Sequence, residues 1–106
     1  LTQILIGGID DSGPHVFSLD PFGSLTEEKC VATGSGSPVA YGVLEDRYRE
    51  GMSIKDVLPI VVQSINSAMK RDTASGDSFD VAVIDENGYR ELSEEEKRSI
   101  LENVQN

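Results

Sequence analysis

Basic residues, cysteine and long apolar runs are scarce in this sequence, and each scarcity excludes a class of protein. Lysine and arginine number 9 against 19 aspartates and glutamates, for a formal net charge of −10. Nucleic acid and anionic membrane surfaces are therefore not expected as partners, because neutralising phosphates requires clustered basic residues. The single cysteine, Cys30, excludes an internal disulfide framework and fits a reducing compartment.

Two further absences concern location and cofactors. No stretch approaches the ~20 apolar residues of a membrane span, and no signal-peptide pattern opens the chain, so we expect an intracellular, cytoplasmic protein. The only histidine, His15, lies beside a turn, and no cysteine or carboxylate spacing around it is typical of a metal site. We expect neither a metal nor a cofactor. The length of 106 residues fits one domain spanning residues 1–106.

The first third of the chain predicts a meander of three strands. Residues 4–9 form a continuous apolar run, which is typical of a strand buried on both faces with a neighbour on either side. A turn cluster at 10–14 and a second turn at 20–24 separate this strand from strands over 15–20 and 25–33. Because the chain reaches a buried strand almost at once and has no initiator methionine, we expect that another segment preceded it.

Two helices follow, over residues 38–49 and 54–71, with apolar side chains at helical spacing. Gly51 ends the first helix, and the short link makes the pair antiparallel neighbours. Gly42 lies inside the first helix at a cost of roughly 1 kcal/mol against alanine, which predicts close packing there. Pro59 does not fit a regular second helix, because by that position every backbone N–H should be bonded. Either the first turn of this helix is distorted or the regular helix begins later than residue 54.

The last third predicts a hairpin and a final helix. Residues 79–84 read as a strand that is apolar on both faces, and residues 89–92 as its return. Asn87-Gly88 between them is a signal for a type I′ turn. Ser93 followed by three glutamates is typical of a capped helix start, with acids at the positive end of the helix dipole. The overall pattern is therefore α+β.

The stretch from Cys30 to Gly42 is the strongest candidate for a functional site. It reads as a strand end, a glycine loop, and a helix opened by Ser37 as N-cap with Pro38 at the first helical position. Gly34 and Gly36 permit a sharp turn, so Ser35 is displayed at a strand-to-helix corner. Corners of this kind often carry functional groups, although the same composition also suits a loop that only connects two elements.

A second polar loop is predicted to meet this corner. In an antiparallel helix pair, the helix over 54–71 ends where the helix over 38–49 begins. The segment 70–76 should therefore lie near Ser35. An anion site at the helix start over 34–37 is an alternative, because helix N-termini bind phosphate. The chain lacks the P-loop lysine and the G-x-G-x-x-G spacing, and its acidic charge opposes anion binding.

Three segments together resemble the later half of archaeal proteasome β subunits. They are Ile-Gly-Gly-Ile-Asp at 6–10, Gly-Ser-Gly-Ser-Pro-Val-Ala-Tyr-Gly-Val-Leu-Glu at 34–45, and Lys-Arg-Asp-Thr-Ala-Ser-Gly at 70–76. The resemblance implies an N-terminal-nucleophile hydrolase with a four-layer αββα sandwich. It also implies seven-membered rings stacked with α rings, polypeptide substrates, and catalysis by an N-terminal threonine whose own amine is the base.

The resemblance also implies roles for individual residues. Ser35 matches the serine that hydrogen-bonds the threonine's amino group, Asp72 the aspartate that orients this pair, and Ser75 a second hydroxyl of the same network. Residues that contact the substrate or the neighbouring subunit are implied at Asp20, Pro21, Phe22, Gly23, Ser24 and Gly36.

The family's nucleophile has no counterpart in these 106 residues. Neither the threonine, nor the aspartate and lysine that follow it, nor the oxyanion glycine is identifiable, and Thr2 leads directly into the first strand. We therefore expect this chain alone to be inactive as a peptidase. A non-catalytic ring subunit of the same fold is the alternative, although such a subunit has no need of Ser35, Asp72 and Ser75.

Overall fold

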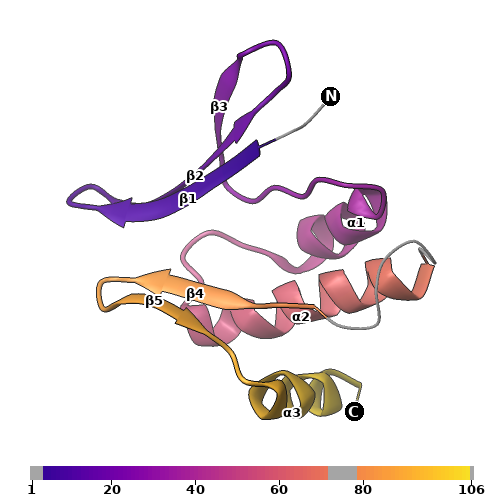
Figure 1. Ribbon diagram of the computed structural model, residues 1–106. Helices are drawn as coiled ribbons and strands as arrows, with labels where there is room; N and C mark the ends of the chain where they lie inside the picture. The colour runs from indigo at the N-terminus through magenta and orange to yellow at the C-terminus, as the bar shows by residue number, and fades with distance from the viewer. Residues whose placement is uncertain (1–3, 72–78, 106) are drawn as a thin grey trace.

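The computed structural model describes residues 4–71 and 79–105 (Figure 1). Strands and helices follow one another in the predicted order: a three-strand meander, a helix pair, a hairpin and a final helix. In Figure 1 the three-stranded sheet lies at one end of the molecule and the final helix at the other. The elements are β1 (Ile4–Asp10), β2 (Gly13–Leu19), β3 (Leu25–Glu28), α1 (Ser37–Arg47), α2 (Ile54–Arg71), β4 (Ala82–Asp85), β5 (Gly88–Glu91) and α3 (Glu94–Gln105).

The first sheet is antiparallel with the strand order β1-β2-β3, so β1 lies at an edge. All seven residues of β1 are exposed, including Ile4 and Ile6. The prediction that residues 4–9 are buried on both faces is therefore wrong for the described chain. The physical reason is that, among the described residues, β2 is the only strand that pairs with β1, and no second layer covers the sheet's outer face.

Each of the three hairpin turns has the sequence Asp-x-x-Gly, at 10–13, 20–23 and 85–88. In each, the aspartate Oδ1 accepts a hydrogen bond from the backbone N–H two residues on, over 2.8, 2.9 and 2.9 Å respectively. The fourth residue is a glycine with positive φ, of 114°, 91° and 108°. Aspartate first and glycine fourth is the signature of a type I turn.

This geometry corrects the turn predicted at Asn87-Gly88. A type I′ turn needs positive φ at both central residues. Among the described residues only glycines have positive φ, so Asn87 does not adopt it. The hairpin forms as predicted, but it uses Asp85 and Gly88 as the ends of the turn, with β4 and β5 paired from Asp85↔Gly88 to Ala82↔Glu91.

The helix pair forms, with three local differences from the sequence pattern. Gly36 rather than Ser37 is the N-cap of α1, and no side chain caps that end. Gly42 has no atom of the described residues within 4 Å of where a Cβ would be, so the predicted close packing is wrong for this part of the chain. Helix α1 buries Ala40 and Leu44 instead. Pro59 lies inside a helix that begins at Ile54, as the periodicity predicted.

The main core lies where α2 meets the second sheet and α3. Val62 of α2 is fully buried and packs in one cluster with Val81, Val83 and Leu92. The backbone N–H of Leu92 donates to the carbonyl of Val81 over 2.8 Å, which extends the β4–β5 ladder by one bond. The N-terminal turn of α3 has the predicted capping box, because Ser93 and Glu96 exchange hydrogen bonds over 3.1 Å in both directions.

Candidate active site

The loop that carries Ser35 forms one wall of an apolar cavity of about 820 Å³. Strand β3 ends at Glu28, so the predicted extension of the strand through Thr33 is wrong. Residues 29–37 line the cavity instead, together with Leu5 of β1, Leu44 of α1 and Val61 of α2. The apolar residues after Lys29 therefore face this space, which accounts for their hydrophobicity without a strand.

Cys30 is the one thiol in this loop, and its surroundings make it a poor nucleophile. Desolvation by partial burial raises the pKa of the thiol, and the nearby carboxylates of Glu45 and Glu28 raise it further. A thiol with a raised pKa carries little thiolate at neutral pH. Cys30 thus has a packing role in the cavity wall.

Gly36 brings the Ser35 corner against the last turns of α2. A Cβ atom at Gly36 would lie 2.9 Å from the Cβ of Ala68, closer than the 3.4 Å at which ordinary contact begins. Helix α2 ends at Arg71, one turn beyond Ala68. The predicted meeting of the corner with the C-terminal end of the second helix is therefore confirmed. Asp72 and Ser75 themselves lie outside the described residues, so their distances to Ser35 stay predictions.

The amides at the start of α1 bear on the alternative of an anion site over 34–37. The Ser37 N–H donates to the carbonyl of Gly34 over 3.1 Å, and the Val39 N–H to that of Gly36 over 3.1 Å. Pro38 has no N–H at all. The first three residues of α1 thus contribute no unused amide to such a site.

The turn over 20–24 is hydrogen-bonded and exposes Phe22 to solvent. Its side chain is 90% exposed. Asp20 holds the turn, because its Oδ1 accepts from the N–H groups of Phe22 and Ser24 over 2.9 and 3.0 Å, and its backbone N–H donates to the carbonyl of Ser24 over 3.0 Å. The turn thus leaves Phe22 accessible, and a contact of residues 20–24 with a substrate or a neighbouring subunit stays a prediction.

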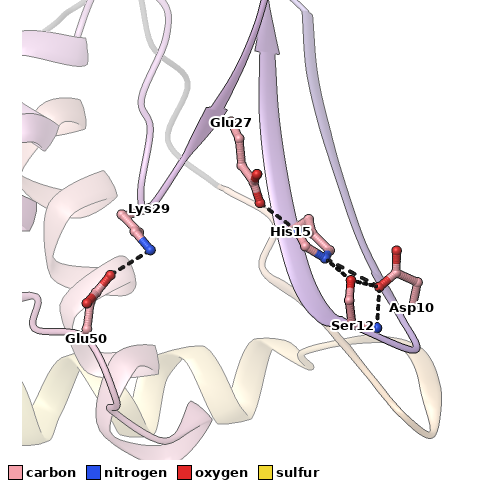
Figure 2. Close-up of polar contacts among 6 residues, drawn as sticks. All are labelled: Asp10, Ser12, His15, Glu27, Lys29 and Glu50. Atoms are coloured by element: carbon pink, nitrogen blue, oxygen red, sulfur yellow. Dashed lines mark hydrogen bonds and ion pairs between the residues drawn. The ribbon is translucent and has the colours of Figure 1, made fainter.

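One polar cluster was missed from the sequence. Figure 2 shows His15 of β2 between Asp10 and Ser12 on one side and Glu27 of β3 on the other. Its Nε2 lies 2.8 Å from Ser12 Oγ, and its Nδ1 lies 2.6 Å from Glu27 Oε1. The cluster was hidden because it depends on strand register, with His15 opposite Gly8 and Glu27 opposite Phe17. No linear spacing in the sequence indicates it.

The serine, histidine and glutamate have the distances of a catalytic triad but not its hydrogen-bond pattern. A triad needs a neutral imidazole that accepts the serine's proton. Ser12 Oγ instead donates to Asp10 Oδ1 over 2.6 Å. Hydrogen bonding to Glu27, followed by the charges of Asp10 and Glu27, raises the pKa of His15 and favours the charged ring. A charged imidazole donates from both nitrogens and cannot act as the base.

The described part of the chain holds no cluster of three or more histidine, cysteine, aspartate or glutamate side chains placed to bind a metal ion. Nor does it contain a helix with the length and apolar character needed to cross a membrane.

Comparison with known proteins identifies the family of this chain. Residues 1–84 match the model of the family described as Proteasome subunit. The Proteasome subunit beta of Methanohalophilus mahii is 50% identical over 105 residues, which cover 98% of this chain and 50% of that protein. The Proteasome subunit beta of Methanosarcina barkeri is 52% identical over 94% of this chain and 48% of its own length. That of Methanopyrus kandleri is 50% identical over 95% and 49%.

The chain therefore spans about half the length of the curated relatives it matches. Its antiparallel sheets and helices form the predicted α+β fold and are consistent with the N-terminal-nucleophile hydrolase sandwich. With a family match over most of its residues and half of them identical to those of archaeal β subunits, this chain belongs to the proteasome subunit family.

Proposed function

We propose that this chain is part of a catalytic β subunit of a proteasome core particle. The complete subunit would hydrolyse peptide bonds of polypeptide substrates in the cytoplasm, without ATP, by the hydroxyl of an N-terminal threonine. In this proposal Ser35, Asp72 and Ser75 support the threonine's amine, which acts as a base only when neutral and correctly oriented. No cofactor takes part.

The observation that carries the proposal is the contact between Gly36 and Ala68. This contact brings Ser35 to the C-terminal end of α2, and Asp72 is the next residue after that end in the sequence. The Ser35 hydroxyl therefore lies at the end of the helix pair from which the segment with Asp72 and Ser75 continues. Ser35 also lines the large cavity beside that end. A network that holds an amine needs such convergence from separate elements.

The assembly belongs to the same proposal. We expect a seven-membered ring of β subunits stacked with α rings, in which the turn over 20–24 contacts the neighbouring subunit. The 90% exposure of Phe22 on an ordered turn supports this contact. Changing Phe22 to serine should weaken the ring, which size-exclusion chromatography coupled to light scattering would measure.

The test of the site uses the complete subunit that contains this chain, assembled with its ring partners. Asp72→Asn and Ser35→Ala should each lower the turnover of a fluorogenic peptide by about 10²-fold or more, in line with loss of acid–base support. Native mass spectrometry should show unchanged assembly. Asp80→Asn is the matched control, because it removes one carboxylate eight residues away and should leave turnover unaltered.

Each outcome separates the proposal from its alternative. Unchanged turnover in both variants would mean that these residues have no part in the chemistry. No turnover in the unaltered assembly would favour a non-catalytic ring subunit. The 106 residues expressed alone should cleave no peptide, and cleavage by a clean preparation would overturn the assignment of the nucleophile to another segment.

A further inference from the structure

His15 lies between carboxylates from two other parts of the first sheet. Its Nδ1 contacts Glu27 Oε1 of β3 at 2.6 Å, and its Nε2 lies 3.3 Å from Asp10 Oδ1 at the end of β1. Ser12 links the same turn to the ring, since its Oγ contacts Nε2 at 2.8 Å and donates to Asp10 at 2.6 Å. One imidazole on β2 thus joins β1 to β3 (Figure 2).

Only a charged ring can donate a proton toward both carboxylates. A neutral imidazole carries one N–H, so it can donate to Asp10 or to Glu27 but leaves a lone pair facing the other. The neutral ring also leaves two negative charges close together across the sheet. The other charged or titratable groups that line the cleft beside His15 do not take the place of the charged ring. Lys29 is paired with Glu50 at 2.7 Å, and Glu28 and Tyr48 supply no positive charge.

We propose that Asp10, His15 and Glu27 form a protonation-dependent clamp that holds the β1–β2 turn against β3. The clamp is closed when His15 is charged and is released when His15 becomes neutral. It does not depend on the proposed peptidase activity, because none of its residues belongs to the Ser35 network.

The expected pH window follows from the direction of each shift. The pKa of His15 is raised above its ordinary 6.5, first by the hydrogen bond to Glu27 and then by Asp10. Its contribution to stability is therefore complete below pH 6.5 and is lost as the pH rises through the raised value. The pKa of Asp10 is lowered from 3.8, mainly by hydrogen bonds from Ser12. Its contribution is lost only as the pH falls through that lower value.

The clamp acts on a sheet whose edge strand is exposed. Strand β1 is an edge strand whose side chains are exposed throughout, and edge strands with apolar side chains pair readily with other chains. Release of the turn loosens the end of the sheet to which this strand belongs. Above neutral pH we therefore expect faster opening of the β1–β2 hairpin relative to β3.

The test follows the proton on the ring itself, in the complete subunit that contains this chain. The ring resonances of His15 are assigned by their loss in His15→Gln and are then titrated by NMR. The midpoint should lie above 6.5. Glu27→Gln and Asp10→Asn should each lower it, Glu27→Gln by more. Asp11→Asn is the matched control, since it removes a carboxylate from the same turn without a recorded contact to the ring, and it should leave the midpoint nearly unchanged.

Hydrogen exchange measures whether the proton holds the strands. Corrected for intrinsic rates, amide protection over 13–16 and 25–28 should fall on the order of twofold from pH 6 to pH 8.5, because exposed ion pairs contribute modestly. His15→Gln should abolish this pH dependence. A midpoint at or below 6.5, or protection that changes equally in His15→Gln, would overturn the proposal.

Discussion

Gly36 leaves no room for a side chain at the contact that brings the Ser35 corner to α2. A Cβ at this position would lie 2.9 Å from the Cβ of Ala68, and 3.8 Å from its carbonyl oxygen. The backbone of Gly36 has φ of −88° and ψ of 5°, which alanine can adopt. The effect of Gly36→Ala is therefore steric, and it acts on the spacing between α1 and α2.

The size of the effect can be estimated from this geometry. The two helices must separate by about 0.5 Å to restore ordinary contact, and overpacking of this kind typically costs about 1–3 kcal/mol. Replacing a glycine by alanine also stabilises the folded protein by about 0.4–1 kcal/mol, because alanine lowers the conformational entropy of the unfolded chain. We expect Gly36→Ala to lower the free energy of unfolding by about 1–2 kcal/mol. For a domain of this size, each kcal/mol lowers Tm by roughly 4–8 °C.

The matched control is the same substitution one and a half turns further along the chain. Gly42 faces open space within α1, so Gly42→Ala should raise the free energy of unfolding by about 1 kcal/mol through helix propensity alone. Urea unfolding of both variants, followed by circular dichroism, measures the difference. Ala68→Gly should partly rescue Gly36→Ala in a double-mutant cycle, because it removes the atom that is contacted. Equal changes in the free energy of unfolding for Gly36→Ala and Gly42→Ala would refute the steric argument. So would the absence of coupling between Gly36→Ala and Ala68→Gly.

Two further predictions concern side chains that the sequence pattern did not single out. Lys97 is 5% exposed and its Nζ donates to the Phe79 carbonyl over 2.5 Å and to Glu94 over 2.7 Å. Lys97→Met keeps the packing of the stem but removes the donors, so unfolding measurements should show a loss of about 1–3 kcal/mol. Ser12 should not react with a fluorophosphonate between pH 6 and 8, as judged by intact mass, because its Oγ donates to Asp10 and not to His15; labelling that requires His15 would contradict this hydrogen-bond pattern.

The order of strands and helices was predictable because it depends on local signals. The capping box at Ser93 and Glu96, the helical spacing through Pro59, and the turn residues at 10–13 and 20–23 all act within a few residues of one another. These signals specify where an element begins, and the structure confirms them closely.

The errors arise where the outcome depends on distant parts of the chain. Residues after Lys29 are apolar because they face the cavity, and an apolar run cannot by itself distinguish a cavity wall from a buried strand. The exposure of Ile4 and Ile6 depends on which segments cover the sheet. The contact between Gly36 and Ala68 was anticipated only as convergence of two loops, because its distance depends on how the helices cross.

The same applies to the His15 cluster. Its partners come from a turn two residues before it and from a strand twelve residues after it, and only the register of the sheet joins them. A histidine beside a turn therefore gives no sequence signal for its protonation state.

The three Asp-x-x-Gly turns have a consequence for the order of folding events. Each turn is held by a hydrogen bond between residues two apart, so forming it requires almost no loop closure. The three hairpins can therefore form on the microsecond scale, before any contact between the two sheets. Bringing β1 beside β4, which lie more than 70 residues apart along the chain, closes a much longer loop, so we expect this step to be slower than hairpin formation. Substitutions in the turns should thus slow an early phase of refolding, whereas substitutions between the sheets should slow the final phase.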